Sequence, residues 1–163
     1  MINRKWHYAE TWPEMALLID EAIKNLESES NSPYYSPGDD ARFMFSDRRY
    51  AGGTDAPNNF LHVAVNSLTG FGALIWFVSD DHPVRGGVFD HVWVSDNLNP
   101  PSFDPRVVSD PGEPRFHDPR SCLPISEVRA ALEEFCRTGT GNRPECIYWV
   151  RGYMNGYRLP EGE

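Results

Sequence analysis

The sequence predicts an α+β domain in which a mainly antiparallel sheet of about five strands packs against two amphipathic helices. Two stretches repeat apolar residues at helical spacing, and several short runs are rich in the β-branched and aromatic residues that favour strands. Two of those runs are separated by only five residues, which is short enough for a β-hairpin. Because 40% of the 163 residues are hydrophobic, we expect residues 1–163 to form a single domain around one core.

The first helix is expected over residues 11–27. Thr11 and Glu14 have the spacing of a capping box, in which the acidic side chain accepts a backbone N–H at the start of a helix. The residues that form one apolar stripe of this helix are Met15, Leu18, Ile19, Ala22, Ile23 and Leu26. Residues 28–40 are rich in Ser, Pro, Asp and Gly and are expected to form a loop.

Strands are expected within residues 42–95. The runs that we assign to them are 42–46, 60–66, 72–78 and 88–94. The sequence Gly70-Phe71-Gly72 begins like a dinucleotide-binding motif, but Ile75 stands where the third glycine belongs. A strand rather than a helix follows, so these residues are expected to form a hairpin turn.

The second half of the chain is interrupted by prolines between residues 96 and 120. We expect this acidic segment to be irregular, with one short edge strand near residues 106–108. The second helix is expected over residues 126–137, followed by a C-terminal glycine at Gly139. The last strand is expected over residues 146–150.

The composition excludes several classes of protein. With 15 Lys and Arg against 24 Asp and Glu, the net charge is −9, which argues against binding to nucleic-acid phosphates. No stretch approaches the about 18 apolar residues of a membrane span, and no apolar run follows the first basic residues as in a signal peptide. Three cysteines without a C-x-x-C pair are typical of reduced thiols, so a cytoplasmic location is expected.

The acidic charge is concentrated between residues 79 and 118, where eight acidic residues stand against three arginines. Aromatic residues are interleaved with these acids. Such a segment is either a solvated loop or a face that binds a basic protein, in which aromatics anchor the contact and carboxylates steer the encounter. The expected contact residues are Asp80, Asp81, Asp90, Trp93, Asp96, Phe103 and Asp104.

No catalytic or metal-binding signature is present in the sequence, and no cofactor is expected. The five histidines form no metalloprotease or deaminase pattern. An alternative is a small enzyme or ligand-binding domain that uses His62, His91 or His117, because His62 and His91 lie on candidate strands. Cys136 falls on the apolar stripe of the second helix and is expected to act as a small hydrophobe. Trp6 and Trp12, which flank the start of the first helix, are candidates for exposed contacts.

The C-terminal half resembles the Imm1 immunity-protein family of bacterial polymorphic toxin systems. The resemblance covers residues 59–149 and depends on the order of several short motifs. These motifs are Gly72-Ala73-Leu74, Leu123-Pro124-Ile125, the helix Val128–Phe135, Thr138-Gly139, Arg143-Pro144-Glu145 and Trp149. The loop between Gly139 and Arg143 and the proline-rich insert are longer than in the usual family pattern.

This resemblance implies a non-enzymatic antitoxin that binds a cognate toxin, often a nucleic-acid deaminase and sometimes a nuclease. The family's motif residues have structural roles and do not indicate which surface binds the toxin. Since a toxin that acts on nucleic acid must be basic around its active site, an acidic inhibitor complements it. We therefore expect a protein that blocks the cleft of such a toxin. The sequence leaves open whether the protein is a monomer before it binds.

Overall fold

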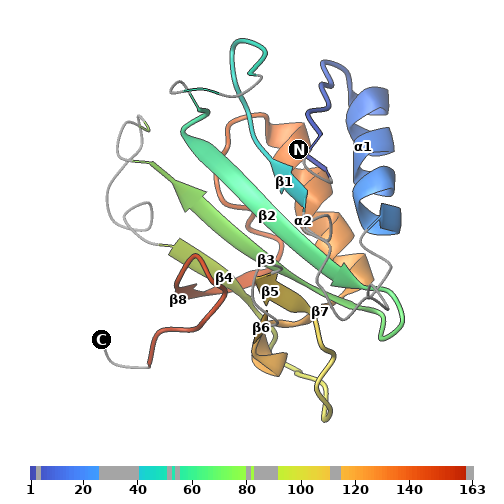
Figure 1. Cartoon of the computed structure of the whole chain (residues 1–163), viewed down its shortest axis with the longest axis vertical. Coiled ribbons are helices and arrows are strands. Elements are labelled where there is room, and N and C mark those ends of the chain that lie inside the picture. The colour runs from blue at the N-terminus through green and yellow to red at the C-terminus, as the bar shows by residue number, and fades with distance from the viewer. Residues whose placement is uncertain are drawn as a thin grey trace.

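The computed structural model describes residues 1–2, 5–25, 41–50, 53, 56–79, 82, 92–110 and 115–160. It confirms the α+β class. The main sheet is antiparallel with the strand order β1-β2-β3-β4-β8, and β7 also pairs with β3 (Figure 1). Its strands are β1 (Ala41–Phe43), β2 (Asn59–Asn66), β3 (Phe71–Val78), β4 (Val92–Asp96), β7 (Leu123–Pro124) and β8 (Tyr148–Gly152).

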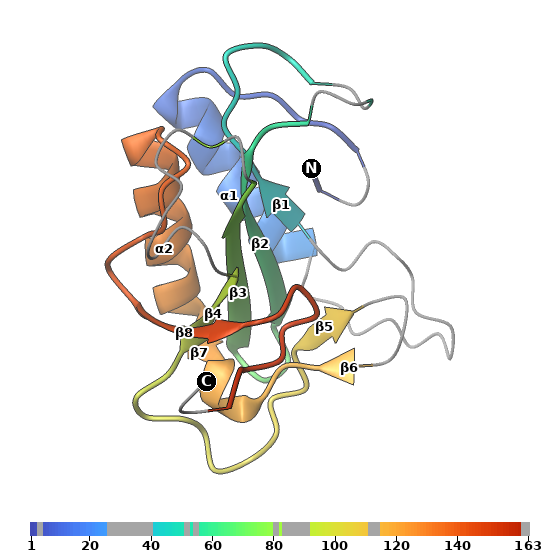
Figure 2. The same ribbon diagram turned by 90° about the vertical axis from the view of Figure 1, so that its left-hand side faces the viewer.

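The helices α1 (Trp12–Asn25) and α2 (Ile125–Thr138) lie together on one face of the sheet (Figure 2). On the other side lies a small two-stranded sheet of β5 (Val108–Asp110) and β6 (Arg115–Phe116). A short 3-10 helix, η2 (Pro119–Ser121), leads from β6 to β7. Among the described residues, no helix is both long and apolar enough to cross a membrane.

The main core fills the space between the helices and the sheet. Successive side chains of a strand point to opposite faces, so alternate residues of β2 and β3 reach this core. Leu61 of β2 is paired with Trp76 of β3, and both are fully buried against residues of α1 and α2. A smaller cluster lies on the opposite face, where Ala64 and Ala73 are buried. Both faces of these two strands are therefore covered, which explains their almost continuous apolar sequence.

The predicted helices are confirmed with small changes in their ends. The Glu14 carboxylate accepts the backbone N–H groups of Glu10 and Thr11, each at 2.9 Å, and these hydrogen bonds lower the pKa of Glu14. The last two residues of the predicted first helix lie outside the described residues. The second helix ends as expected at Gly139, whose φ of 62° is in the left-handed region and whose N–H donates to the Phe135 carbonyl.

The ends of two strands are set by side chains that form hydrogen bonds with the adjacent backbone groups. The predicted strand 42–46 stops at Phe43, because the Asn59 side chain binds both the N–H and the carbonyl of Phe45. The predicted strand 146–150 begins only at Tyr148. The Glu134 carboxylate accepts the N–H groups of Glu145 at 2.7 Å and Cys146 at 2.9 Å, so these groups do not join the sheet.

The other two differences concern the acidic half of the chain. Residues 88–91 of the fourth predicted strand lie outside the described residues, and β4 extends to Asp96. The expected edge strand near residues 106–108 is shifted to β5, because Arg106 has a φ of 52° and interrupts the extended backbone. Within the described residues, the proline-rich segment is irregular between β4 and β5 and again between β6 and η2.

Candidate functional site

The sequence-predicted contact residues are only partly within the described structure. Asp80, Asp81 and Asp90 lie outside the described residues. The other four, which lie on β4 and on the connection from β4 to β5, are Trp93, Asp96, Phe103 and Asp104. These four fall into two pairs that differ in how much they contact the rest of the protein.

Phe103 and Asp104 are exposed on the connection that follows β4. The Phe103 ring touches the edge of the Phe71 ring, with centroids 5.8 Å apart. The Asp104 carboxylate accepts the N–H of Arg106 at 2.8 Å, and the Asn66 amide donates to the Pro105 carbonyl at 3.1 Å. The loop is therefore tied to β2 and holds both side chains toward solvent.

Trp93 and Asp96 instead make contacts within the protein. Trp93 is half-buried and packs against the main core, and the Arg143 guanidinium lies 4.2 Å from its ring centroid. The Asp96 carboxylate is 2.7 Å from a guanidinium nitrogen of Arg158. Both residues stabilise the fold, so a substitution of either one affects stability as well as any contact with a partner.

Two of the three histidines of the alternative hypothesis, His62 and His117, lie near each other in the structure, and both are buried. Burial, and to a smaller extent the proximity of His62, lower the pKa of His117 to about 3. This imidazole is neutral at physiological pH and poorly suited to acid–base catalysis. His91 lies outside the described residues, and no group of His, Cys, Asp and Glu within the described part of the chain could hold a metal ion.

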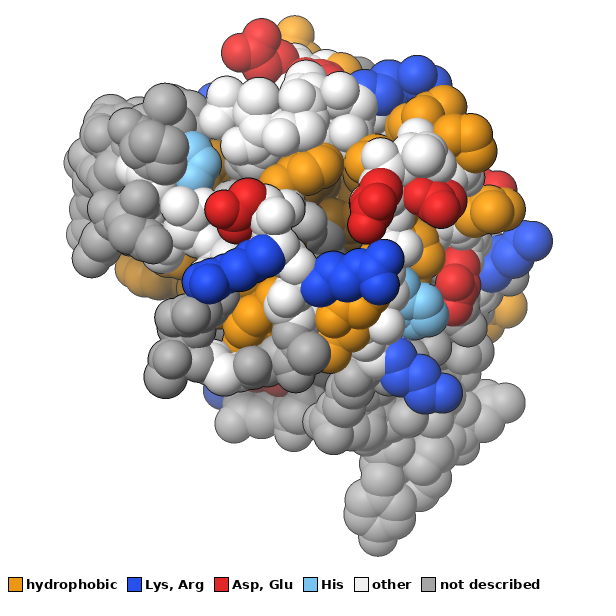
Figure 3. Space-filling model, turned by 90° about the horizontal axis from the view of Figure 1, so that it is seen from above, with side chains coloured by type: hydrophobic (Ala, Val, Ile, Leu, Met, Phe, Trp, Pro, Cys, Tyr) orange, Lys and Arg blue, Asp and Glu red, His pale blue; other side chains and the backbone are white. Residues whose placement is uncertain are grey.

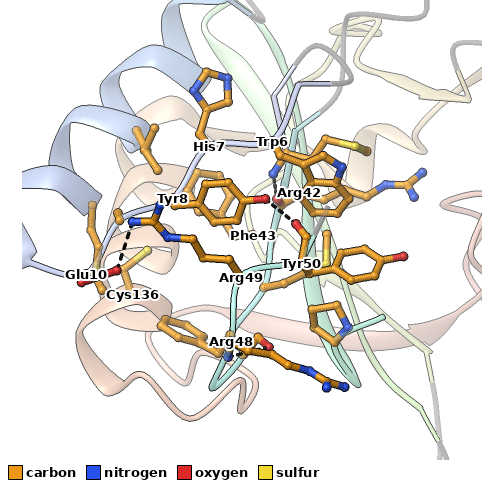
Figure 4. Close-up of a pocket in the computed structure, with 18 of the residues that line it drawn as sticks. Trp6, His7, Tyr8, Glu10, Arg42, Phe43, Arg48, Arg49, Tyr50 and Cys136 are labelled. Atoms are coloured by element: carbon orange, nitrogen blue, oxygen red, sulfur yellow. Dashed lines mark hydrogen bonds and ion pairs between the residues drawn. The ribbon is translucent and has the colours of Figure 1, made fainter. Parts of the chain in front are cut away.

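A pocket of about 400 Å³ lies elsewhere, between the N-terminal segment, α1 and the connection from β1 to β2 (Figure 4). Trp6 and Tyr50 meet at nearly a right angle across it, with ring centroids 4.8 Å apart. The Tyr8 hydroxyl donates to the Tyr50 carbonyl at 2.6 Å, and Arg49 lies over the Tyr8 ring. These contacts join two segments that are distant in the sequence.

The lining of this pocket combines charged and apolar side chains. Figure 3 looks onto this end of the molecule, where basic, acidic and hydrophobic side chains lie next to one another. Arg49 forms an ion pair with Glu10 at 3.3 Å. Cys136 also lines the pocket, and burial raises the pKa of its thiol to about 12, so it is not a thiolate nucleophile. Among the residues that line the pocket, Trp6 was predicted from the sequence as a contact residue. The pocket itself was not predictable, because it forms only when the β1–β2 connection folds back against the N-terminal segment.

Comparison with known proteins gives one match. The family model described as "Immunity protein Imm1" matches residues 4–151, which is most of the chain. The chain belongs to the Imm1 family. No curated protein and no solved structure matches it. The match agrees with the resemblance expected from the C-terminal motifs and extends it over the N-terminal helix.

The Imm1 motif residues build the framework of the fold. A Cβ atom on Gly72 would lie 3.1 Å from a methyl group of Val128, so this glycine lets β3 approach α2 closely. The Trp149 indole donates to the Pro144 carbonyl at 2.7 Å, which fixes the loop before β8. Arg143 covers the Trp93 ring. As members of an immunity family are non-catalytic inhibitors, the partner of this Imm1 protein is a cognate toxin.

Proposed function

We propose that this protein binds a cognate bacterial toxin and blocks its active cleft. We further propose that the toxin is a nucleic-acid deaminase. The match to the Imm1 family is the observation that carries the proposed binding to a toxin. The net charge of −9 supports the choice of toxin, because an enzyme that binds nucleic acid has a basic cleft. Opposite charge accelerates the encounter and excludes wrong partners.

The proposed contact surface is the acidic segment that includes β4 and the loop after it. Exposed Phe103 and Asp104, held on a loop that is tied to β2, favour this surface. An aromatic ring that is already ordered loses little entropy when it enters a partner's pocket. The charges proposed to face the toxin are Asp80, Asp81, Asp90, Asp96 and Asp104, with Trp93 and Phe103 as apolar anchors.

The proposed compartment is the cytoplasm, where an immunity protein meets a toxin before the toxin reaches nucleic acid. The three cysteines are free thiols in the structure, which suits a reducing compartment.

Charge reversal tests the surface. We expect Asp80→Lys/Asp81→Lys to abolish protection of cells that express the toxin and to weaken binding of the purified toxin domain at least tenfold. The control Glu127→Lys/Glu145→Lys makes the same change in net charge at two exposed positions on α2 and the loop after it. Equal binding by both variants would place the contact surface elsewhere.

The class of toxin is tested separately. The toxin domain encoded beside this protein should convert cytosine or adenine in single-stranded DNA or RNA, and addition of this protein should stop the reaction. Cleavage of the strands without base conversion would identify a nuclease and contradict the deaminase assignment.

A further inference from the structure

The chain turns back on itself after β8 and packs against the sheet (Figure 2). The Tyr153 N–H donates to the Tyr157 carbonyl at 2.8 Å, and the Leu159 N–H donates to the Arg151 carbonyl at 2.9 Å. Arg158 also forms an isolated bridge with Gly152. Residues 153–159, the tail, are therefore an ordered hairpin beside the edge strand of the sheet.

Two features fix the tail in this position. Gly152 leaves room for it, since a Cβ atom there would lie 2.5 Å from the Tyr157 carbonyl oxygen. The Arg158 guanidinium donates hydrogen bonds to the Asp96 carboxylate at 2.7 Å and to the Arg120 carbonyl at 3.2 Å. The ion pair is largely shielded from water, so it holds the tail more firmly than a surface pair would.

The ordered tail leaves large side chains in solvent. The tyrosine surface consists of Tyr148, Tyr153, Met154 and Tyr157, which are between 45% and 64% exposed. They make up four of the nine large hydrophobic residues that are exposed in the described part of the chain, within ten positions of one another. Tyr153, Met154 and Tyr157 share one hairpin, whereas Tyr148 lies at the other end of β8. Exposed apolar side chains that gather on one surface indicate an interaction site. Tyrosine is enriched among the residues that dominate binding energy.

The tyrosine surface is continuous with the proposed acidic contact surface. Tyr148 is paired with Asp96 across β8 and β4, so the two side chains lie on the same face of the sheet. The acidic connection that carries Phe103 and Asp104 begins directly after Asp96. The tail, by contrast, follows residue 151, the last residue matched to the family model.

We propose that the cognate toxin docks on the tyrosine surface, and that this surface determines which toxin the protein recognises. The inference depends on the proposed function, because it takes the toxin as the occupant. The matching area of the toxin is apolar and carries carbonyl or carboxylate groups that accept hydrogen bonds from the tyrosine hydroxyls. Because the tail is ordered before binding, its side chains lose little conformational freedom in the complex.

The test compares two variants against a catalytically inactive form of the toxin domain encoded in the adjacent reading frame. The first is Tyr148→Ser/Tyr153→Ser/Met154→Ser, whose side chains are about half exposed or more. The matched control is Leu17→Ser/Leu68→Ser, which removes exposed hydrophobic residues from α1 and from the β2–β3 turn. Thermal unfolding of each variant checks that the fold is retained.

We expect the triple variant to weaken the dissociation constant at least 100-fold and the control to change it less than threefold. A triple variant that binds the toxin as well as the parent protein would overturn this inference while leaving the proposed function intact. A parent protein that neither binds nor protects would overturn both. Self-association of the parent protein that is lost in the triple variant, with toxin binding unchanged, would identify a contact between two copies and contradict the inference.

Discussion

Asp96 and Arg158 form an ion pair, with the carboxylate and guanidinium 2.7 Å apart, that connects the end of β4 to the tail of the chain. Arg158 also donates to the Arg120 carbonyl and lies 3.3 Å from the Ser121 hydroxyl. One side chain thereby joins three segments: β4, η2 and the tail.

The first prediction concerns this ion pair. Arg158→Ala leaves a half-buried carboxylate without its partner, so we expect it to lower the free energy of unfolding by about 2 kcal/mol. Urea denaturation measures this change. Arg49→Ala is the control, because Arg49 and Glu10 form a well-exposed pair, and it should cost less than about 0.5 kcal/mol. Equal losses in the two variants would show that Arg158 does not secure the tail.

The second prediction is a dependence of stability on pH that comes from His117. Burial lowers the pKa of this imidazole to about 3 in the folded protein, whereas the unfolded chain binds the proton near its ordinary value of about 6.5. The unfolded state therefore binds more protons below that pH, and stability falls as the pH drops from about 6.5 towards 3. One such group contributes about 1.4 kcal/mol per pH unit in this range.

Urea denaturation at pH 7 and pH 5 tests the contribution of His117. Because carboxylates titrate as well, the informative quantity is the difference between the parent protein and His117→Gln, which cannot be protonated. The parent should lose about 2 kcal/mol more than the variant between these pH values. The same pH dependence in both proteins would mean that His117 can accept a proton in the folded state.

The third prediction separates the two kinds of sequence-predicted contact residue. Trp93→Ala removes a ring that packs against the core beneath Arg143, and we expect a loss of about 2–4 kcal/mol in unfolding free energy. Phe103→Ala removes an exposed ring and should cost less than about 1 kcal/mol. Chemical denaturation of both variants provides the comparison. A small loss for Trp93→Ala would indicate that its ring is available to a partner.

The fourth prediction concerns the close approach of β3 and α2. A Cβ atom on Gly72 would lie 2.8 Å from the Ala64 carbonyl oxygen and 3.1 Å from a Val128 methyl, so Gly72→Ala should cost about 1–3 kcal/mol. Gly70→Asn is the control, since the space around Gly70 is open and Asn tolerates its φ of 77°. Thermal unfolding should show a clearly larger loss for Gly72→Ala.

The helices and central strands were predictable because their signals are local. The prediction of α2 depends on the spacing of apolar residues up to Cys136, and that of the hairpin depends on the short connection between β2 and β3. Both signals come from residues that are close together in the sequence. The ends of β1 and β8 were not predictable, because Asn59 and Glu134 bind backbone groups from other parts of the chain.

The same distinction applies to the candidate site. The sequence identified Trp93 and Asp96 as available residues, yet Arg143 and Arg158, which contact them, come much later in the chain. Phe103 and Asp104 were predicted as contact residues from the acidic and aromatic composition of their segment, and both side chains are exposed. The tyrosines of the tail gave no such signal, since their exposure depends on where the tail packs.

The position of β8 has a consequence for how the protein folds. This strand joins the sheet beside β4, and Arg158 is 62 residues from Asp96 along the chain. Contacts between residues so far apart close large loops and are expected to form late in folding. During synthesis, the surface that includes Tyr148 and the tail cannot form until residue 158 has left the ribosome.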